Sequence, residues 1–327
     1  MSILFISLLL GFFITLFFIP VWIKRSRDVG LVGKDMNKNS EEKISEAGGL
    51  AVLLGFVLST LFYIGIKTFY FKDSTNLIEI FSLLTVILII SLVGLMDDIL
   101  GWKIGLNKKT RIFFLVFAAI PLMVINAGQS EVMNLEIGLL YPLFFIPLGI
   151  VGASATFNFI AGYNGLEASQ GILILSALAL VSWKTGNSWL GLIALIMVSC
   201  LIAFYIFNKY PAKVFPGDVL TYSIGALIAI IAILGNIEKI AVFFFIPYIL
   251  ETILKIRGRL KKESFAKVNE DGSLSIPYDK FYGLEHISIY LLKKLKKDKK
   301  AYEKEVVYLI NLFQIIVIIL GLVLFLR

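Results

Sequence analysis

The chain has 327 residues and a formal net charge of +8, with 58% hydrophobic and only 17% charged residues, and its mean hydropathy is +0.89. Soluble domains are about 45–50% apolar, so this composition excludes a soluble globular domain and indicates an integral membrane protein. The single cysteine, Cys200, excludes a disulfide within the chain.

Ten apolar runs are long enough to cross a bilayer, which takes about 17–25 residues. They predict an all-α, polytopic membrane protein with ten transmembrane helices, in which residues 1–327 form a single membrane domain. The first run has no basic region before it and no cleavage site after it, so we expect a retained helix and not a signal peptide. The fourth is short and contains Pro121, where a kink is expected. The ten runs are 3–23, 48–67, 77–96, 112–127, 137–157, 169–186, 188–207, 219–236, 239–255 and 305–326.

The basic residues give these helices an orientation. Of the 31 lysines and arginines, 26 fall at Lys255 or in the loops 24–47, 97–111, 158–168, 208–218 and 256–304. By the positive-inside rule these loops are cytoplasmic and both termini lie outside. The expected location is the cell membrane of a microbe or the endoplasmic reticulum of a eukaryote. The basic face suits anionic lipid and also an anionic substrate.

Residues 257–304 form a cytoplasmic insert between the ninth and tenth helices. A turn at 269–272 between short apolar segments predicts a small β-hairpin. A basic amphipathic helix is expected from about residue 285 to 300, lying along the membrane. The only histidine, His286, is expected at the membrane interface.

Polar residues gather at the cytoplasmic ends of the predicted spans. Asp97 and Asp98 end the third span, and Lys108 and Lys109 follow in the same loop. Adjacent carboxylates are costly unless a cation neutralises them or one is protonated, and Mg²⁺ prefers such oxygen ligands together with substrate phosphate. The plain alternative is a solvated acidic pair. The first loop offers residues that suit either the rim of a polar cavity or a solvated basic loop: Asp35, Asn37, Lys38 and Glu46.

Two further polar positions fall on the same face. Asn158 and Asn164 lie in a glycine-containing loop, and their amides suit a metal or a base edge, or simply a well-hydrogen-bonded loop. Asp218 begins the eighth span, where a helix N-cap is the plain alternative. Carboxylates and amides for a metal, with lysines for phosphate, together predict phosphoryl transfer at a membrane surface.

Four segments carry a resemblance to a known family: Gly-Lys-Asp-Met-Asn-Lys at 33–38, Gly-Leu-Met-Asp-Asp at 94–98, Asn-Phe-Ile-Ala-Gly-Tyr-Asn-Gly-Leu-Glu at 158–167 and Val-Phe-Pro-Gly-Asp at 214–218. In this order, over nearly the whole chain, they resemble the polyprenyl-phosphate N-acetylhexosamine-1-phosphate transferases, membrane enzymes that begin lipid-linked glycan synthesis. The likeness is closer to the eukaryotic and archaeal branch, the UDP-N-acetylglucosamine:dolichyl-phosphate N-acetylglucosamine-1-phosphotransferases.

The resemblance implies a role for each matched residue. The metal ligands would bind Mg²⁺, or Mn²⁺, beside the substrate pyrophosphate; Asn164 would read the uracil, and one of the two lysines would meet phosphate. The implied metal ligands are Asn158 and Asp218, the catalytic residues Asp97, Asp98, Lys108 and Lys109, and the substrate-binding residues Met36, Glu46, Asn164, Arg257, Arg259, Lys261 and Lys262.

The chain departs from the family pattern in two places. Ala155 stands where many members carry another asparagine, and the last cytoplasmic loop lacks the histidine motif of the family. The basic residues at 257–262 are therefore expected to contact phosphate or sugar instead, because guanidinium groups bind phosphate with two hydrogen bonds.

The implied reaction is attack of a lipid phosphate on the β-phosphorus of UDP-N-acetylglucosamine, with release of UMP. The expected partners are this nucleotide sugar, polyprenyl or dolichyl phosphate and membrane lipid, with no nucleic acid; a homodimer is an open possibility. The same chemistry with another UDP-N-acetylhexosamine or with undecaprenyl phosphate is the nearest alternative. A lipid transporter or flippase is a remote alternative. It would place charges at mid-membrane and repeat one half of the chain, and the sequence shows neither feature.

Overall fold

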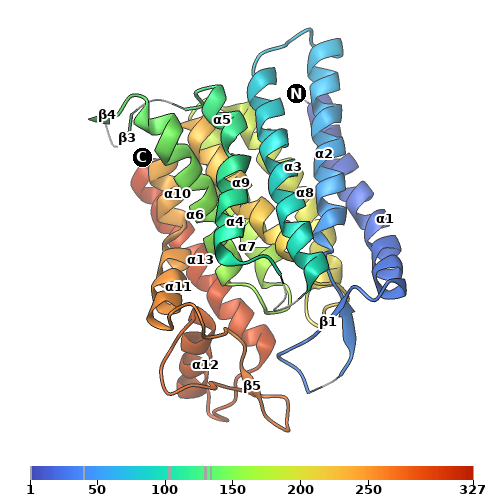
Figure 1. The fold of residues 1–327 in the computed structure, drawn as a ribbon, viewed down its shortest axis with the longest axis vertical. Coiled ribbons are helices and arrows are strands. Elements are labelled where there is room, and N and C mark those ends of the chain that lie inside the picture. The colour runs from blue at the N-terminus through green and yellow to red at the C-terminus, as the bar shows by residue number, and fades with distance from the viewer. Residues whose placement is uncertain (1, 40, 102–104, 129–130, 133–134, 327) are drawn as a thin grey trace.

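A computed structural model of the chain describes all residues except 1, 40, 102–104, 129–130, 133–134 and 327. Figure 1 shows a bundle of long helices with short strands in the loops. The helices are α1 (Ile6–Asp28), α2 (Gly49–Gly65), α3 (Leu77–Leu100), α4 (Lys108–Ala118), α5 (Ile120–Val124), α6 (Ile146–Phe159), α7 (Leu166–Lys184), α8 (Ser188–Asn208), α9 (Asp218–Gly235), α10 (Glu238–Phe244), α11 (Ile246–Arg257), α12 (Leu284–Leu295) and α13 (Glu303–Phe325). Two-stranded hairpins are formed by β1 (Val32–Lys34) with β2 (Lys43–Ser45), β3 (Glu131–Val132) with β4 (Leu135–Glu136), and β5 (Lys267–Val268) with β6 (Leu274–Ser275).

Among the described residues, eight helices are long and apolar enough to cross a membrane, and each matches a predicted span within a few residues. The other two predicted spans are broken. Residues 112–127 fall in α4 and α5, and residues 239–255 in α10 and α11. Pro121 and Pro247 occupy the second position of α5 and α11, where proline suits a helix start but not a helix interior. The helix is interrupted at Ala119, near Pro121, where a kink is expected. The prediction of ten membrane-spanning helices is not confirmed.

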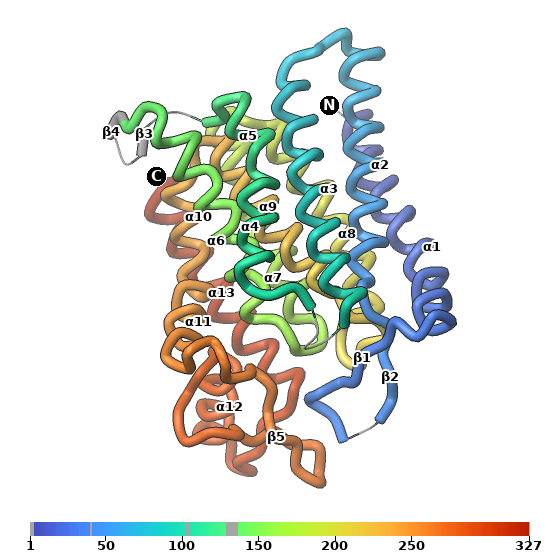
Figure 2. The backbone as a smooth tube through the Cα atoms, in the orientation of Figure 1, coloured from blue at the N-terminus to red at the C-terminus, as the bar shows by residue number. Residues whose placement is uncertain are grey.

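The two ends of the bundle differ in what they carry. The segments that lead into α2, α7, α9 and α13 all lie at the lower end, whereas both chain termini lie towards the upper end (Figure 2). This arrangement agrees with the predicted grouping of the basic loops on one side. It gathers the polar motifs, which lie far apart in sequence, at one end of the molecule.

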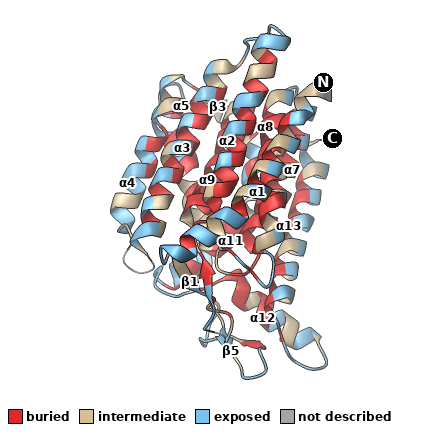
Figure 3. Ribbon diagram, turned by 90° about the vertical axis from the view of Figure 1, so that its right-hand side faces the viewer, coloured by how far each residue is buried: buried red, intermediate tan, exposed pale blue. Residues whose placement is uncertain are grey.

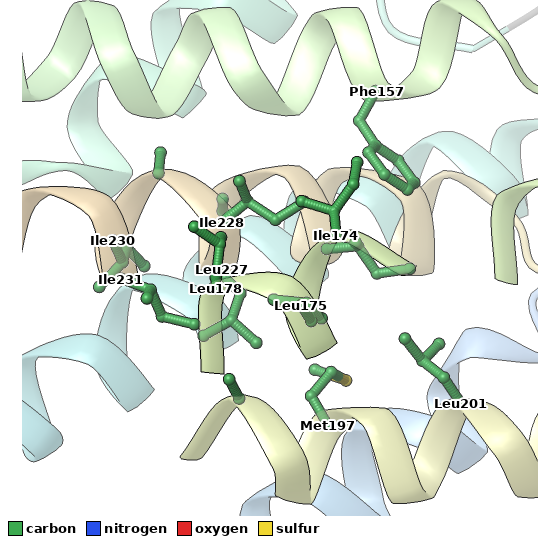
Figure 4. Packing of buried hydrophobic residues seen from close by; sticks show 14 of the residues in the cluster. Phe157, Ile174, Leu175, Leu178, Met197, Leu201, Leu227, Ile228, Ile230 and Ile231 are labelled. Carbon is green, nitrogen blue, oxygen red and sulfur yellow. The ribbon is translucent and has the colours of Figure 1, made fainter. Parts of the chain in front are cut away.

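Helix α9 forms the centre of the bundle. It is apolar on every side, as is typical of a core helix, and 89% of its span is buried. Figure 4 shows Ile228 and Leu227 of α9 among Ile174 and Leu178 of α7, with Met197 of α8 beside them. Figure 3 shows buried residues in the central helices and exposed ones along outer helices such as α4. Helix α9 is therefore held by packing on several sides.

The insert contains the predicted hairpin, with Lys267 opposite Ser275 and Val268 opposite Leu274. The predicted amphipathic helix is α12, which ends at Leu295 and is shorter than expected. The interfacial position expected for His286 is wrong. This side chain is fully buried because α12 packs against α11 and α13, and its Nδ1 accepts a hydrogen bond from the backbone N–H of Tyr282 at 3.2 Å.

Candidate active site

A cavity of about 1,300 Å³ lies at the end of the bundle where α9 begins. Its wall combines the first loop, the end of α3, the start of α4, the loop between α6 and α7 and the segment before α9. The structure thus brings together residues from every motif noted in the sequence. The predicted site residues that line the cavity are Met36, Glu46, Asp97, Asp98, Lys108, Asn158, Asn164 and Asp218.

Five predicted site residues lie outside this wall: Lys109, Arg257, Arg259, Lys261 and Lys262. All five are exposed, and the Lys262 ammonium lies 4.7 Å from the centroid of the Tyr278 ring. The segment 257–262, which carries four of them, contacts the cavity rim through its backbone, since the Leu260 carbonyl accepts a hydrogen bond from Lys108 Nζ at 3.2 Å. The structure therefore separates Lys108 from Lys109, which the sequence alone did not.

Asp98 caps α9 from another helix. Its Oδ1 accepts the backbone N–H of Asp218 at 2.7 Å and its Oδ2 that of Val219 at 3.1 Å. A carboxylate in this position pairs two N–H groups that the helix leaves free and meets the positive end of the helix dipole. The N-cap residue itself is Gly217, which has no side chain to contribute. The alternative that Asp218 serves as the N-cap is therefore wrong.

Two motif glycines make this cap possible. A Cβ atom at Gly94 would lie 2.6 Å from the Asp218 carbonyl oxygen and the Val219 nitrogen, so only glycine lets α3 touch the first turn of α9. Gly217 has φ +74°, and a Cβ there would collide with the Asp98 carboxylate. Glycine at both positions therefore lets the Asp98 carboxylate reach the N-terminus of α9.

Asp97 is held by a different set of donors. Its Oδ1 accepts the backbone N–H of Leu106 at 2.5 Å, and its Oδ2 pairs with the Arg111 guanidinium. Arg111 Nη1 also lies 3.8 Å from Asp218 Oδ2, and its side chain lines the cavity. Arg111 is not among the predicted site residues because it directly precedes a predicted span. Its position three residues after Lys108 would place both on one face of a helix, and that spacing was an available signal.

Asn158 and Asp218 lie in contact, as a shared metal site would require. Asn158 Nδ2 donates to Asp218 Oδ1, and the Thr221 hydroxyl donates to Asn158 Oδ1, both at 3.0 Å. The same hydroxyl lies 3.4 Å from the Asp218 carbonyl oxygen, so it keeps an acceptor if the amide rotates to present its oxygen beside the carboxylate. These oxygen donors fit Mg²⁺. Within the described ranges no group of three or more His, Cys, Asp or Glu side chains could hold a metal ion. The oxygen donors that meet here are one carboxylate and one amide.

The first loop reaches the cavity because it is tied to the segment before α9. The Phe215 N–H donates to the Ser45 carbonyl at 2.8 Å, and the Gly48 N–H donates to the Phe215 carbonyl at 2.9 Å. Glu46 lies between these bonds and faces the cavity, and burial raises the pKa of its carboxyl above the ordinary value.

Asn164 is surrounded by acceptors. Its Nδ2 donates to Asp35 Oδ2 at 3.0 Å, and its backbone N–H donates to Glu303 Oε1 at 2.8 Å. Asp35 in turn pairs with Lys38 at 2.7 Å. Glu303 was not among the sequence predictions because it begins α13, 139 residues further along the chain. A contact of this kind is not visible in local sequence.

A bundle of membrane-length helices with a cavity lined by carboxylates, amides and cations at one end is the arrangement expected of a membrane-embedded transferase of phosphoryl groups. Comparison with known proteins agrees. The profile of glycosyl transferase family 4 matches residues 80–236. A protein of Saccharolobus solfataricus, provisionally named UDP-N-acetylglucosamine–dolichyl-phosphate N-acetylglucosaminephosphotransferase, is 36% identical over 290 residues, 86% of each chain.

Two other relatives extend this comparison. A protein of the same provisional name from Sulfolobus acidocaldarius is 32% identical over 276 residues, 82% of each chain. A phospho-N-acetylmuramoyl-pentapeptide-transferase of Streptococcus agalactiae is 29% identical over 270 residues, 76% of this chain and 79% of the relative. The chain belongs to glycosyl transferase family 4 and is a membrane-bound enzyme, which confirms the resemblance seen in its sequence.

Proposed function

We propose that this enzyme transfers N-acetylglucosamine 1-phosphate from UDP-N-acetylglucosamine to dolichyl phosphate or a related polyprenyl phosphate and releases UMP. The observation that carries the proposal is the convergence of Asp97, Asp98, Asn158 and Asp218 on one cavity at the end of a membrane bundle. The names of the two archaeal relatives that match over most of both chains support the choice of substrates.

In this reaction an oxygen of the lipid phosphate forms a bond to the β-phosphorus of the nucleotide sugar. The bond from that phosphorus to the bridging oxygen breaks, and the electron pair leaves with UMP. A phosphate monoester has a second pKa of about 6, so the nucleophile is already largely ionised near neutral pH. Positioning and charge neutralisation therefore matter more than proton removal.

The chain offers a division of labour for these tasks. Asn158 and Asp218 would hold Mg²⁺, which neutralises charge on the pyrophosphate when it is bound. Arg111 and Lys108 line the cavity as cations for phosphate oxygens, and a guanidinium suits this because it can donate two parallel hydrogen bonds. Asp98 fixes the start of α9 and Asp97 fixes Arg111, so the acidic pair acts as positioning residues.

The lipid substrate has an apolar surface beside these cations. Helix α4 carries Lys108 and Arg111 at its start, and its following residues Ile112, Phe113 and Phe117 are exposed. A polyprenyl chain lying along α4 would bring its phosphate to the cavity rim. With the basic loops on the same end, this rim would face the cytoplasm.

The test is purified full-length enzyme in lipid nanodiscs with Mg²⁺, dolichyl phosphate and a panel of UDP-sugars, scored by UMP release. We expect UDP-N-acetylglucosamine to be the preferred donor, with release that depends on the lipid phosphate and stops with EDTA. A second arm replaces dolichyl with undecaprenyl phosphate and offers UDP-N-acetylmuramoyl-pentapeptide, because one relative carries that activity in its name. Absence of UMP release in every arm would refute the transferase proposal.

A further inference from the structure

Two carboxylates clamp the amide of Asn164 in one orientation. Asn164 Nδ2 lies 3.0 Å from Asp35 Oδ2 and 3.5 Å from Glu303 Oε2. An ionised carboxylate accepts hydrogen bonds and does not donate them, so the nitrogen of the amide faces Asp35, with Glu303 Oε2 at the outer limit of hydrogen-bond distance. The amide oxygen, Oδ1, is left as the acceptor of Asn164, a residue that lines the cavity.

Both clamping residues are themselves fixed. Asp35 is 3% exposed; its Oδ1 accepts the Asn37 N–H at 3.1 Å, and its Oδ2 pairs with Lys38 at 2.7 Å. Glu303 is also 3% exposed, and its Oε1 accepts the backbone N–H of Asn164 at 2.8 Å. The clamp therefore holds the backbone and the side chain of the same residue from two sides.

The two clamping residues differ in their access to the cavity. Asp35 lines the cavity, whereas Glu303, at the start of α13, is not among the lining residues and contacts Asn164. Glu303 thus reaches a ligand only through Asn164. If the amide turned over, its oxygen would face two carboxylates, which costs electrostatic energy on both sides.

We infer that Asp35 and Glu303 are positioning residues that select uracil over cytosine by fixing Asn164 Oδ1 as an acceptor. This inference rests on the proposed function, in which Asn164 reads the base of the nucleotide sugar. Uracil presents a donor, N3–H, on its pairing edge, whereas cytosine presents an unprotonated acceptor at the same position. A fixed acceptor therefore bonds the first and repels the second, while a freely turning amide would accommodate either.

The test measures UDP and CDP binding to the full-length enzyme in nanodiscs with Mg²⁺, together with kcat and KM for UDP-N-acetylglucosamine. Glu303→Gln keeps an oxygen for the Asn164 backbone N–H but places an amide nitrogen near Nδ2. We expect the preference for UDP over CDP to fall about tenfold, the effect of one lost hydrogen bond, with a higher KM and a kcat within about twofold. Asn164→Ala sets the floor of discrimination.

Two more variants complete the design. Asp35→Asn weakens the other side of the clamp and carries the test if Glu303→Gln does not fold. Glu305→Gln is the matched control, because Glu305 lies in the same helical turn but bonds Lys296 and the Tyr302 N–H; it should keep the wild-type preference. Unchanged discrimination in the clamp variants, or an equal loss of UDP and CDP binding, would overturn the inference alone. Wild-type enzyme that binds neither nucleotide would instead overturn the proposed function.

Discussion

Replacement of Asp98 by asparagine tests whether this carboxylate acts through helix α9. The aspartate accepts two backbone N–H groups of the first turn, at 2.7 and 3.1 Å. Asparagine has one oxygen for one of them, and its NH₂ group would face the other donor. A charged hydrogen bond contributes about 1.5–3 kcal/mol and the helix dipole about 0.3–1 kcal/mol. We therefore expect a loss of about 2–4 kcal/mol and a melting temperature lower by several degrees.

The same substitution should reduce catalysis because Asp218 is the first residue of the displaced turn. A misplacement of about 1 Å can cost about 100-fold in rate, so UMP release should fall by at least that factor. Thermal unfolding and UMP release are measured on the same nanodisc preparation, with Asp279→Asn, an exposed aspartate in the insert, as the control. A wild-type melting curve with abolished activity would refute the positioning argument and assign Asp98 a direct chemical role. Wild-type activity would remove it from the mechanism.

Three other substitutions test the remaining parts of the site. Arg111→Gln should lower UMP release about 100-fold or more because Asp97 and Asp218 lose their shared cation, whereas Lys109→Gln on the same helix should stay within twofold; equal effects would contradict the separation of these residues. Asn158→Ala should raise the Mg²⁺ concentration for half-maximal UMP release about tenfold or more, and an unchanged Mg²⁺ titration would exclude it as a ligand. Burial, followed by the Lys255 charge, lowers the pKa of His286 from 6.5 to about 4, so the unfolded chain binds a proton between these values that the folded chain does not. The contribution of His286 to the free energy of unfolding is then fully present above pH 6.5 and is lost as pH falls towards 4. His286→Asn should flatten this pH dependence in thermal unfolding, and an unchanged slope of stability against pH would contradict the lowered pKa.

Much of the fold can be predicted from the sequence because a long uninterrupted apolar run identifies a membrane helix. Eight predicted spans coincide with helices of the structure, and the hairpin signalled at 269–272 forms as β5 and β6. The two predicted spans that are broken in the structure, 112–127 and 239–255, share a cause. Around Pro121 and Pro247 the apolar run continues while the helix stops, since hydropathy registers side chains and not the missing backbone donor of proline.

The sequence predicts many residues of the candidate site but not the contacts between them. Asp97, Asp98, Asn158 and Asp218 could be grouped because each ends or begins an apolar run on one face. That Asp98 caps a helix 120 residues away follows only from the packing of Gly94 on α9. His286 was misjudged for a related reason, because an amphipathic pattern indicates one apolar face but not whether protein or lipid covers it.

The charges around the start of α9 bear on the proposed Mg²⁺ site. Three carboxylates, those of Asp97, Asp98 and Asp218, meet at the first turn of the most buried helix, and the guanidinium of Arg111 contacts two of them. The backbone donors that Asp98 accepts carry only partial charge. More negative than positive charge is thus held at the first turn of α9, and a cation with two positive charges would restore the balance. With the proposed Mg²⁺ at Asp218, the anionic nucleotide pyrophosphate would bind together with that cation, and metal binding and substrate binding would be linked.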